Sequence, residues 1–459
     1  MVPQERIRMR NSKPVIGERT YILYWMQSAQ RVQENPALSY AIEIANSLHK
    51  PLIVCFGLTG DFLNATKRHY RFLLEGLSDV ETRLKEMGIR FVLSPEGPIE
   101  GPLRLAGDAA MMVTDFAYGK LERLWRKEVA ARVSCSLVQI ETNVVVPVET
   151  ASSKEEYSAA TLRRKIEPMI AHFVSSIPLR AIKISSTDIA LNIPELSLSD
   201  IPHIMSTVNI PSGASECSWI SGGETAAQNQ LNDFIENRLE GYGSRHNDPA
   251  DPYDSGLSPY LHFGHISPVS IYNEVVGKAV GDVSDFIEEL IVRRELAINF
   301  VYYNPRYDSY SGLPEWAQKS LSKHEVDPRE YCYTYRELLS AKTHDPYWNA
   351  AQQELVYFGT MHGYMRMYWG KKILEWSPSP QQAFSTALDL NNRFQLDGRD
   401  PNGYAGVAWC FGKHDRPWVE RPIFGNVRYM NDKGLERKFA IKRYVERIEK
   451  AKERSFGKE

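Results

Sequence analysis

Several signals that would assign this chain to a particular class are missing. The sequence holds no run of about 18 apolar residues, so no transmembrane helix is expected. Its basic start, MVPQERIRMRNSK, has no apolar core behind it and does not resemble a secretory signal. No Cys-x-x-Cys or Cys/His ligand spacing occurs, so we expect no metal site, reduced thiols and a cytoplasmic location. The cysteines are odd in number and widely scattered: Cys55, Cys135, Cys217, Cys332 and Cys410.

An excess of charge of one sign is also missing. The chain has 55 Lys and Arg against 57 Asp and Glu, a net charge of −2, so its overall charge does not indicate nucleic-acid binding. A partner of that kind would need a local patch. Residues 421–455 hold eleven basic and five acidic residues. A solvated terminal helix is the ordinary interpretation of such a run, and DNA contact is the alternative.

The first 150 residues alternate between apolar runs and helical patterns. Continuous apolar runs are typical of strands that are covered on both faces, so the region predicts a Rossmann-like α/β domain with a parallel sheet. No G-x-G-x-x-G and no P-loop follows any run, which disfavours a nicotinamide dehydrogenase. The expected strands are 20–25, 51–56, 90–94, 110–115 and 137–141, and the main helices are 35–48, 67–87 and 119–133.

The remaining chain contains no comparable strand signal. Residues 151–222 begin with a helical pattern and continue as a Pro- and Ser-rich linker, which we expect to lie over the surface. From residue 223 onward helical patterns dominate and predict an all-α domain. They cover 223–239, 268–279, 283–300, 335–341, 348–376, 380–390 and 435–452.

Two stretches in this helical region carry unusual polar residues. Residues 361–376, MHGYMRMYWGKKILEW, predict a helix that holds Arg366. Residues 390–409 contain DGRDPNG, a cluster of turn formers that begins with Asp397. Because an Arg and an Asp that are buried together must pair, we expect an ion pair between Arg366 and Asp397. A planar guanidinium can stack on a flat polar ring, so these surroundings would suit a flavin. The alternative is a polar loop that caps an aromatic core helix.

Longer motifs carry a family resemblance. Nine motifs occur in one order along nearly the whole chain. They are YWMQSAQR, VTDF, RHNDP, LSPYLHFGHIS, EELIVRRELAINFVYYNP, THDPYWNA, HGYMRMYWGKKILEW, LDGRDPNGYAG and HDRPW. Together they resemble the class II cyclobutane pyrimidine dimer (CPD) photolyases. The resemblance implies an antenna-type α/β domain at 1–150, a linker at 151–222 and a helical FAD-binding catalytic domain at 223–459. It also implies a monomer that uses light to repair pyrimidine dimers in double-stranded DNA.

The resemblance further implies which residues bind the cofactor. Asn391 matches an asparagine that faces flavin N5, although an Asn also commonly ends a helix. Arg366 and Asp397, with the adjoining Gly398 and Arg399, match residues that flank the isoalloxazine ring. The residues that match the pyrophosphate contacts are Tyr242, Ser255, Gly256, Leu257, Ser258 and Pro259. Without the resemblance, the segment 255–259 indicates only the start of a helix.

Substrate and electron-transfer residues are implied in the same way. Glu289 matches a pocket glutamate that contacts the dimer, whereas its ordinary interpretation is an i,i+4 pair with Arg293. Trp409 matches a tryptophan that packs against the flipped dimer, and Met367 and Tyr364 are assigned beside it. Three further aromatic residues match a chain that carries electrons to the flavin, although such residues are usually core: Trp348, Trp369 and Trp376.

Two positions depart from the family pattern. His246 stands where a second Arg is usual, and we expect it to pair with Asp415 when protonated. YWMQSAQR replaces the usual RDQR next to Tyr24, Trp25 and Met26, where the resemblance implies an antenna chromophore of the deazaflavin type. The alternatives are a cryptochrome-like blue-light sensor without repair activity, a (6-4) photoproduct lyase, and a DNA-binding scaffold that has lost its flavin.

Overall fold

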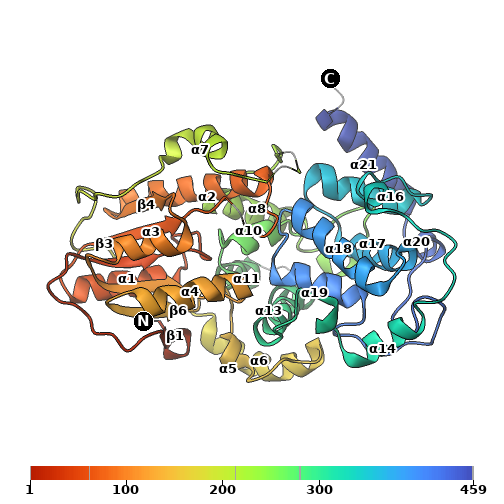
Figure 1. Ribbon diagram of the computed structural model, residues 1–459, viewed down its shortest axis with the longest axis horizontal. Coiled ribbons are helices and arrows are strands. Elements are labelled where there is room, and N and C mark those ends of the chain that lie inside the picture. The colour runs from red at the N-terminus through yellow and green to blue at the C-terminus, as the bar shows by residue number, and fades with distance from the viewer. Residues whose placement is uncertain (1, 61, 212, 215, 279–280, 457–459) are drawn as a thin grey trace.

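The computed structural model describes residues 2–456 except 61, 212, 215 and 279–280. Figure 1 shows a sheet covered by helices in the N-terminal half of the chain and a group of helices, without any sheet, in the C-terminal half. The predicted α/β fold with a helical second half is confirmed. None of the helices among these residues combines the length and the apolarity needed to cross a membrane.

The sheet has six strands in the order β1-β6-β5-β2-β3-β4. All neighbours are parallel except β1 and β6, which pair antiparallel at one edge. The five predicted strands are present; β1 was not predicted, because three residues are too few to show a pattern. The strands are β1 (Ile7–Met9), β2 (Tyr21–Trp25), β3 (Leu52–Gly57), β4 (Arg90–Ser94), β5 (Ala109–Asp115) and β6 (Ser136–Ile140).

Each strand contributes side chains to two separate cores, one on each face of the sheet. Ile22 and Tyr24 pack with α1 (Pro36–Ser47) and α2 (Lys67–Glu86). Leu23 and Trp25, on the other face, pack with α3 (Gly97–Leu105) and α4 (Lys120–Arg132). Burial on both faces explains why these strands are mostly apolar; the exceptions include Thr114 and Gln139.

The segment between the two halves packs on both of them. Helix α5 (Val148–Ala151) leads to α6 (Ala159–Phe173), whose buried residues share one core with those of the helical half. The Pro-rich stretch that follows returns to the sheet, where the Leu196 N–H donates to the Leu93 carbonyl oxygen at 2.9 Å. It contains η2 (Leu198–Asp200) and α7 (Ile201–Thr207), which lies along α2 in Figure 1.

The helical half is built from short segments. In chain order they are α8 (Glu224–Asn237), α9 (Tyr242–Arg245), α10 (Ser258–Phe263), α11 (Pro268–Lys278), α12 (Ser284–Ile287), the π-helical turn η3 (Glu288–Arg293), α13 (Arg294–Tyr303), η4 (Tyr310–Gly312), α14 (Glu315–Lys323), α15 (Tyr335–Leu339), α16 (Pro346–Gln353), the π-helical turn η5 (Glu354–Phe358), α17 (Gly363–Trp376), α18 (Pro380–Phe394), α19 (Pro401–Cys410), α20 (Asp432–Lys438) and α21 (Ile441–Phe456).

Two predicted helices are interrupted. The helix expected over 348–376 ends at Gly359, which has φ +67°, and α17 restarts after His362, whose ring accepts from the Tyr364 N–H. The helix expected over 435–452 is broken at Phe439, which is extended. In both cases the apolar periodicity continues across the break, so the pattern alone does not reveal it. Helix α19 was not predicted, because the turn formers at its start indicate a loop.

Candidate functional site

Three elements of the helical half converge around Tyr242. Its ring stacks on His246 at 4.6 Å and meets Phe286, one turn before Glu289, edge-on at 5.3 Å. His362, the N-cap of α17, has its Nε2 3.1 Å from the His246 carbonyl oxygen. Residues that lie far apart in the sequence therefore form one wall, which joins α9, α12 and the start of α17.

Glu289 lies close to Tyr242 of this wall, at the start of η3. Its side chain is accessible to solvent, yet the surrounding protein raises the pKa of its carboxyl group through burial. The i,i+4 pair with Arg293 is not formed, because the Arg293 Nε donates to Glu288 at 3.1 Å instead. The π-helical turn changes the angular spacing of the side chains here, and such turns are frequent at functional sites.

The segment Ser255–Pro259 leads into α10 and, through it, to the Asp397 turn. Gln230 Nε2 donates to the Ser255 carbonyl oxygen at 2.7 Å, and Gly256 has φ +68°. A side chain on Gly256 would also meet Gln230 at 2.7 Å. At the other end of α10, a ring nitrogen of His262 lies 3.2 Å from Asp400.

Arg366 and Asp397 approach one another but do not form a close ion pair. Arg366 Nη2 lies 3.9 Å from Asp397 Oδ2, and the Asp397 side chain is only 6% exposed. The Nε of Arg366 and the Oδ1 of Asp397 are buried without a hydrogen-bond partner. Because an unsatisfied buried donor or acceptor costs about 1–3 kcal/mol, these two atoms indicate a site for a polar ligand.

The turn that carries Asp397 has a demanding backbone. A Cβ on Gly398 would lie 2.8 Å from the carbonyl oxygens of Asn391 and Gln395, so only glycine fits. Arg399 adopts φ +71°, which is uncommon for a residue with a side chain. Its N–H donates to Asn392 Oδ1 at 3.1 Å, a contact that helps to hold this conformation.

Asn391 is buried beside this turn, at the end of α18. Its Nδ2 donates to Asn392 Oδ1 at 3.2 Å, and the residue is 2% exposed. A Cβ on Gly403 of α19 would lie 2.9 Å from the same Nδ2. The amide of Asn391 therefore has space next to α19 only because residue 403 is a glycine.

Trp348, Trp369 and Trp376 form one buried group, with exposures of 0%, 2% and 2%. The ring centroids of Trp348 and Trp376 are 5.6 Å apart. Trp348 Nε1 donates to the Trp369 carbonyl oxygen at 3.0 Å, and Trp369 Nε1 donates to Gln352 at 2.8 Å. The structure therefore brings Trp348 and Trp376 into ring contact and links Trp348 to the backbone of Trp369.

Trp409 lies apart from that group, between two cations. Lys371 Nζ is 5.5 Å from its ring centroid and the guanidinium of Arg428 is 5.7 Å from it. Arg428 also stacks over Trp418, which is 38% exposed and contacts Arg416 in the same way. Lys371 is fully buried, which lowers its pKa to about 8.

Sequence reasoning missed this basic and aromatic surface. Arg416 and Trp418 belong to HDRPW, which was noted as a motif but given no role, and Arg428 was counted only as part of the basic tail. Tyr364, assigned to the substrate, contacts Phe439 edge-on at 4.7 Å. Met367 is partly buried, and its carbonyl oxygen accepts from Cys410 Sγ at 3.8 Å.

The basic tail packs against the helical half instead of forming one solvated helix. Ile441, Tyr444 and Ile448 of α21 are at most 2% exposed. Arg447 forms an ion pair with Glu354 at 3.2 Å. Part of the tail's positive charge is therefore structural, and only the remainder is available to a partner.

The expected pair of His246 and Asp415 is not formed. His246 Nδ1 contacts the Tyr242 carbonyl oxygen at 2.7 Å while its ring stacks on Tyr242. Asp415 instead accepts from Trp418 Nε1 at 3.1 Å. The stacking on Tyr242 holds the imidazole in a different direction from the one that the pairing requires.

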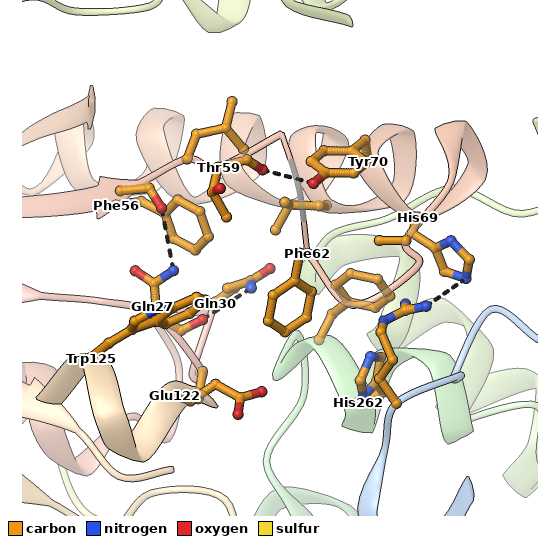
Figure 2. A pocket seen from close by; sticks show the side chains of 17 residues that line it. Gln27, Gln30, Phe56, Thr59, Phe62, His69, Tyr70, Glu122, Trp125 and His262 are labelled. Atoms are coloured by element: carbon orange, nitrogen blue, oxygen red, sulfur yellow. Dashed lines mark hydrogen bonds between the residues drawn. The ribbon is translucent and has the colours of Figure 1, made fainter. Parts of the chain in front are cut away.

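A separate cavity of about 140 Å³ lies at the carboxyl ends of β2, β3 and β5. This is the point where the strand order reverses, a usual ligand position in such sheets. Figure 2 shows Gln27, Gln30, Phe62 and Trp125 around it, with His69 and His262 at one end. Tyr24, Trp25 and Met26, where an antenna was expected, are fully buried, and the residues after them line the cavity.

The loop that forms this cavity is held by Asp115, at the end of β5. Its Oδ2 accepts from the N–H groups of Gln27, Ser28 and Ala29 at 2.8, 2.8 and 3.0 Å. Arg126 donates to Oδ1 at 2.5 Å. On the opposite side, Arg399 of the Asp397 turn lines the same cavity, so one turn contributes to both candidate sites.

Comparison with known proteins gives a consistent result. The family described as DNA photolyase matches residues 22–181. A deoxyribodipyrimidine photo-lyase from Methanothermobacter thermautotrophicus is 52% identical, over 98% of this chain and 99% of that protein. Another from Arabidopsis thaliana is 41% identical, over 92% of this chain and 88% of its own length.

Solved structures show the same fold. A class III photolyase from Agrobacterium tumefaciens superposes with a TM-score of 0.73 at 20% identity and covers 94% of this chain and 86% of that one. An archaeal photolyase from Sulfolobus tokodaii, solved with two FAD molecules, gives a TM-score of 0.70 at 15% identity, over 93% and 90% of the two chains. The two photo-lyases from Methanothermobacter and Arabidopsis are 52% and 41% identical to this chain over 98% and 92% of its length. The chain therefore belongs to the DNA photolyase family.

Proposed function

We propose that this protein repairs cyclobutane pyrimidine dimers in DNA by light-driven electron transfer, as a photolyase of the class II type. The observation that carries the proposal is the Arg366–Asp397 arrangement, in which a buried donor and a buried acceptor have no partner. The names of the curated relatives and the motifs of the sequence support the same activity.

FAD is the cofactor that fits this donor set. The Asp397 carboxylate would accept from the ring amide, and the Arg366 guanidinium would offset negative charge on the reduced ring. Asn391 would face N5, Gly398 and Arg399 would shape the turn at the ring, and Tyr242 with Ser255–Pro259 would hold the pyrophosphate. When bound and reduced, the cofactor supplies the electron that light drives to the dimer, and it receives that electron back after the ring splits.

The lesion would enter between Glu289 and Trp409. Trp409 offers an aromatic face on which an extruded base can stack, and a dimer unstacks at lower cost than an intact pair. Glu289, with its raised pKa, can donate a hydrogen bond to a pyrimidine carbonyl group when it is protonated. Tyr364 and Met367 would complete the pocket wall, while Arg416 and Arg428 would contact the phosphates of double-stranded DNA.

The three buried tryptophans would carry electrons toward the cofactor. Trp369 lies on α17 with Arg366, and Trp348 and Trp376 continue the path to Tyr333, which meets Trp376 edge-on at 5.3 Å. The amide of Gln352 and a backbone carbonyl group hold the indoles in place, which limits their movement while charge passes.

The cavity in Figure 2 is the proposed antenna site, for a chromophore of the deazaflavin type. Its mixture of amide side chains, aromatic rings and the Arg399 guanidinium suits a flat polar ring system. We also propose the division into an antenna domain (1–150), a linker (151–222) and a catalytic domain (223–459). On the same proposal the protein acts as a monomer in the cytoplasm, next to DNA.

The test is a visible absorption spectrum of the purified protein, followed by lit and dark incubation with an oligonucleotide that carries a thymine dimer. Flavin bands and a loss of the dimer in the light alone are expected. Asp397→Asn is the matched variant and should lose flavin without unfolding. Flavin bands without repair would instead identify a cryptochrome-like sensor, and absence of flavin from the wild-type protein would refute the cofactor assignment.

A further inference from the structure

A second cavity, of about 530 Å³, lies on the other side of α4 from the cavity in Figure 2. It is bounded by the residues after β5, by α4 and by the end of α13. In the part of the chain that the structure describes, no Asp or Glu lines it. Five cations do: Arg10, Lys120, Arg123, Arg126 and Lys127.

The two cavities use opposite faces of α4. Lys120, Arg123 and Lys127 recur at helical spacing and so share one face, whereas Glu122 and Trp125 face the cavity in Figure 2. The second cavity is therefore a separate site. It is also independent of the residues assigned above to the flavin and to the lesion.

Two of the five cations are neutralised. Lys120 lies 2.6 Å from Asp308, and Arg126 lies 2.5 Å from the buried Asp115. Among the residues that the structure describes, no carboxylate lies within ion-pair distance of the other three: Arg10, Arg123 and Lys127. The cavity is thus left with three positive charges that have no acidic partner.

The charges also repel one another. Partial burial lowers the pKa of Arg10, and the like charges of Arg8, Arg123 and Arg126 lower it further. Arg123 donates from Nη1 to the Tyr302 carbonyl oxygen at 2.9 Å, and its guanidinium lies over the Tyr302 ring, 4.5 Å from the centroid. An anion bound among these groups would relieve the repulsion, so the arrangement favours a ligand with more than one negative charge.

The rest of the wall is mostly aromatic and apolar, with the amides of Gln139 and Asn304 as its other polar side chains among the described residues. Phe116 and Tyr302 have ring centroids 5.7 Å apart, and Tyr303 meets Tyr302 edge-on at 4.9 Å. The Tyr303 hydroxyl donates to the Ser152 carbonyl oxygen, at 2.5 Å. Leu124 lines the cavity while 55% exposed, so an apolar surface faces the solvent beside the cations.

We propose that this cavity binds a nucleoside diphosphate, with the phosphates on Arg10, Arg123 and Lys127 and the base against the aromatic wall. A flat base suits that wall, and a diphosphate supplies the multiple negative charge. The volume lies within the range of about 300–1,000 Å³ that is usual for small ligands. A nucleic-acid strand would instead need cations that follow a groove, whereas these converge on one cavity.

The test is calorimetry of the flavin-loaded protein with ADP, GDP and UDP, each compared with inorganic pyrophosphate, the matching nucleoside and a short single-stranded oligonucleotide. Saturable binding of at least one diphosphate is expected, tighter than that of its nucleoside and of pyrophosphate. The double variant Arg10→Gln, Lys127→Gln should weaken it by about tenfold or more, because each change removes a charged hydrogen-bond donor.

Lys85→Gln, on the exposed surface of α2, is the matched control and should bind as the wild type does. Both altered residues of the double variant are exposed, and its thermal unfolding should match that of the wild type. Four results would overturn the proposal: no saturable binding of any diphosphate, equal affinity for pyrophosphate, unchanged affinity in the double variant, or binding of the oligonucleotide alone.

Discussion

Two buried Arg–Asp pairs, one in each half of the molecule, are built very differently. Arg126 and Asp115 meet at 2.5 Å, with side chains 1% and 0% exposed. Arg126 also donates from Nε to the Asp115 carbonyl oxygen at 2.7 Å and from Nη1 to the Glu122 carbonyl oxygen at 3.0 Å. Arg366 and Asp397 stay 3.9 Å apart, with one buried nitrogen and one buried oxygen unpartnered.

The difference separates an ion pair whose groups are satisfied from one that leaves buried atoms without a partner. A buried ion pair stabilises a fold only when its geometry is close and its remaining donors and acceptors are satisfied. The first pair meets that condition and organises the loop Gln27–Ala29. The second does not meet it within the protein, so its missing partners are expected to come from a ligand. Four predictions follow this contrast, in order of expected effect.

The largest effect is expected at the satisfied pair. Asp115→Ala leaves the Arg126 charge buried without its partner, which should lower the free energy of unfolding by about 3–5 kcal/mol. Urea denaturation measures the change. Asp308→Ala, which removes the exposed partner of Lys120, is the control and should cost less than about 1 kcal/mol. Equal losses in the two variants would contradict a structural role for the buried pair.

The aromatic residues beside the two pairs extend the contrast. Trp25 lies 5.3 Å from the Arg126 guanidinium, and Trp369 shares α17 with Arg366. Trp369→Phe should almost abolish photoreduction of the oxidised flavin, yet spare repair when the flavin is reduced chemically. Trp25→Phe should lower the free energy of unfolding without changing photoreduction of the flavin. Flash-photolysis measurements on both variants test this, and normal photoreduction in Trp369→Phe would remove that residue from the electron path.

A smaller effect is expected at the open pair. Asp397→Asn keeps the shape of the side chain but removes its charge, so flavin affinity should fall by roughly 10- to 100-fold, the value of a charged hydrogen bond. The flavin-free protein should unfold at nearly the same urea concentration as the wild type. Fluorescence titration with FAD measures the affinity, and Asp389→Asn on α18 serves as control. A large loss of stability without loss of affinity would make Asp397 a structural residue.

The smallest effect is expected at Glu289, which belongs to neither of the two Arg–Asp pairs. Burial raises the pKa of its carboxyl group, so the protonated form persists to higher pH than usual and is lost as the pH rises through that pKa. The repair rate should therefore decline with rising pH. Glu289→Gln should be slower by a few-fold to about tenfold at low pH, with flavin still bound, and should show no such decline.

The adjacent Glu288 is the matched control for this measurement. Its contacts with Arg163 hold the Glu288 pKa below the usual range, so Glu288→Gln should keep the wild-type pH profile. An unchanged repair rate in Glu289→Gln, or the same decline with pH in both variants, would remove Glu289 from the substrate pocket.

Local patterns in the sequence carried much of the architecture. The five apolar runs predicted β2 to β6, because burial on both faces favours apolar residues at most positions of a strand. Helices α1, α2 and α4 followed from their periodicity. The break at Gly359 could not be predicted in this way, because the apolar spacing continues on both sides of it. The break is accompanied by a tertiary contact, between the ring of His362 and the His246 carbonyl oxygen.

The candidate site shows the same limit. Motif resemblance pointed to Arg366, Asp397, Asn391 and Glu289 and to the neighbourhood of Met26, but not to the second cavity across α4. Pairing of His246 with Asp415 was expected from the motifs and is wrong, because stacking on Tyr242 directs the imidazole elsewhere. The grouping of Arg416, Trp418 and Arg428 beside Trp409 became visible only in the fold, where Arg428 contacts both tryptophans and Arg416 contacts Trp418.

By itself the sequence determined the family and the succession of a sheet and a helical half, and it predicted the polar residues of the candidate site. These depend on composition, on periodicity and on motifs that are local in the chain. Only the tertiary structure decided which charges are satisfied and which are not. Whether a donor finds an acceptor depends on atoms from distant segments, so Asp115 and Asp397 look alike in sequence and differ only after folding.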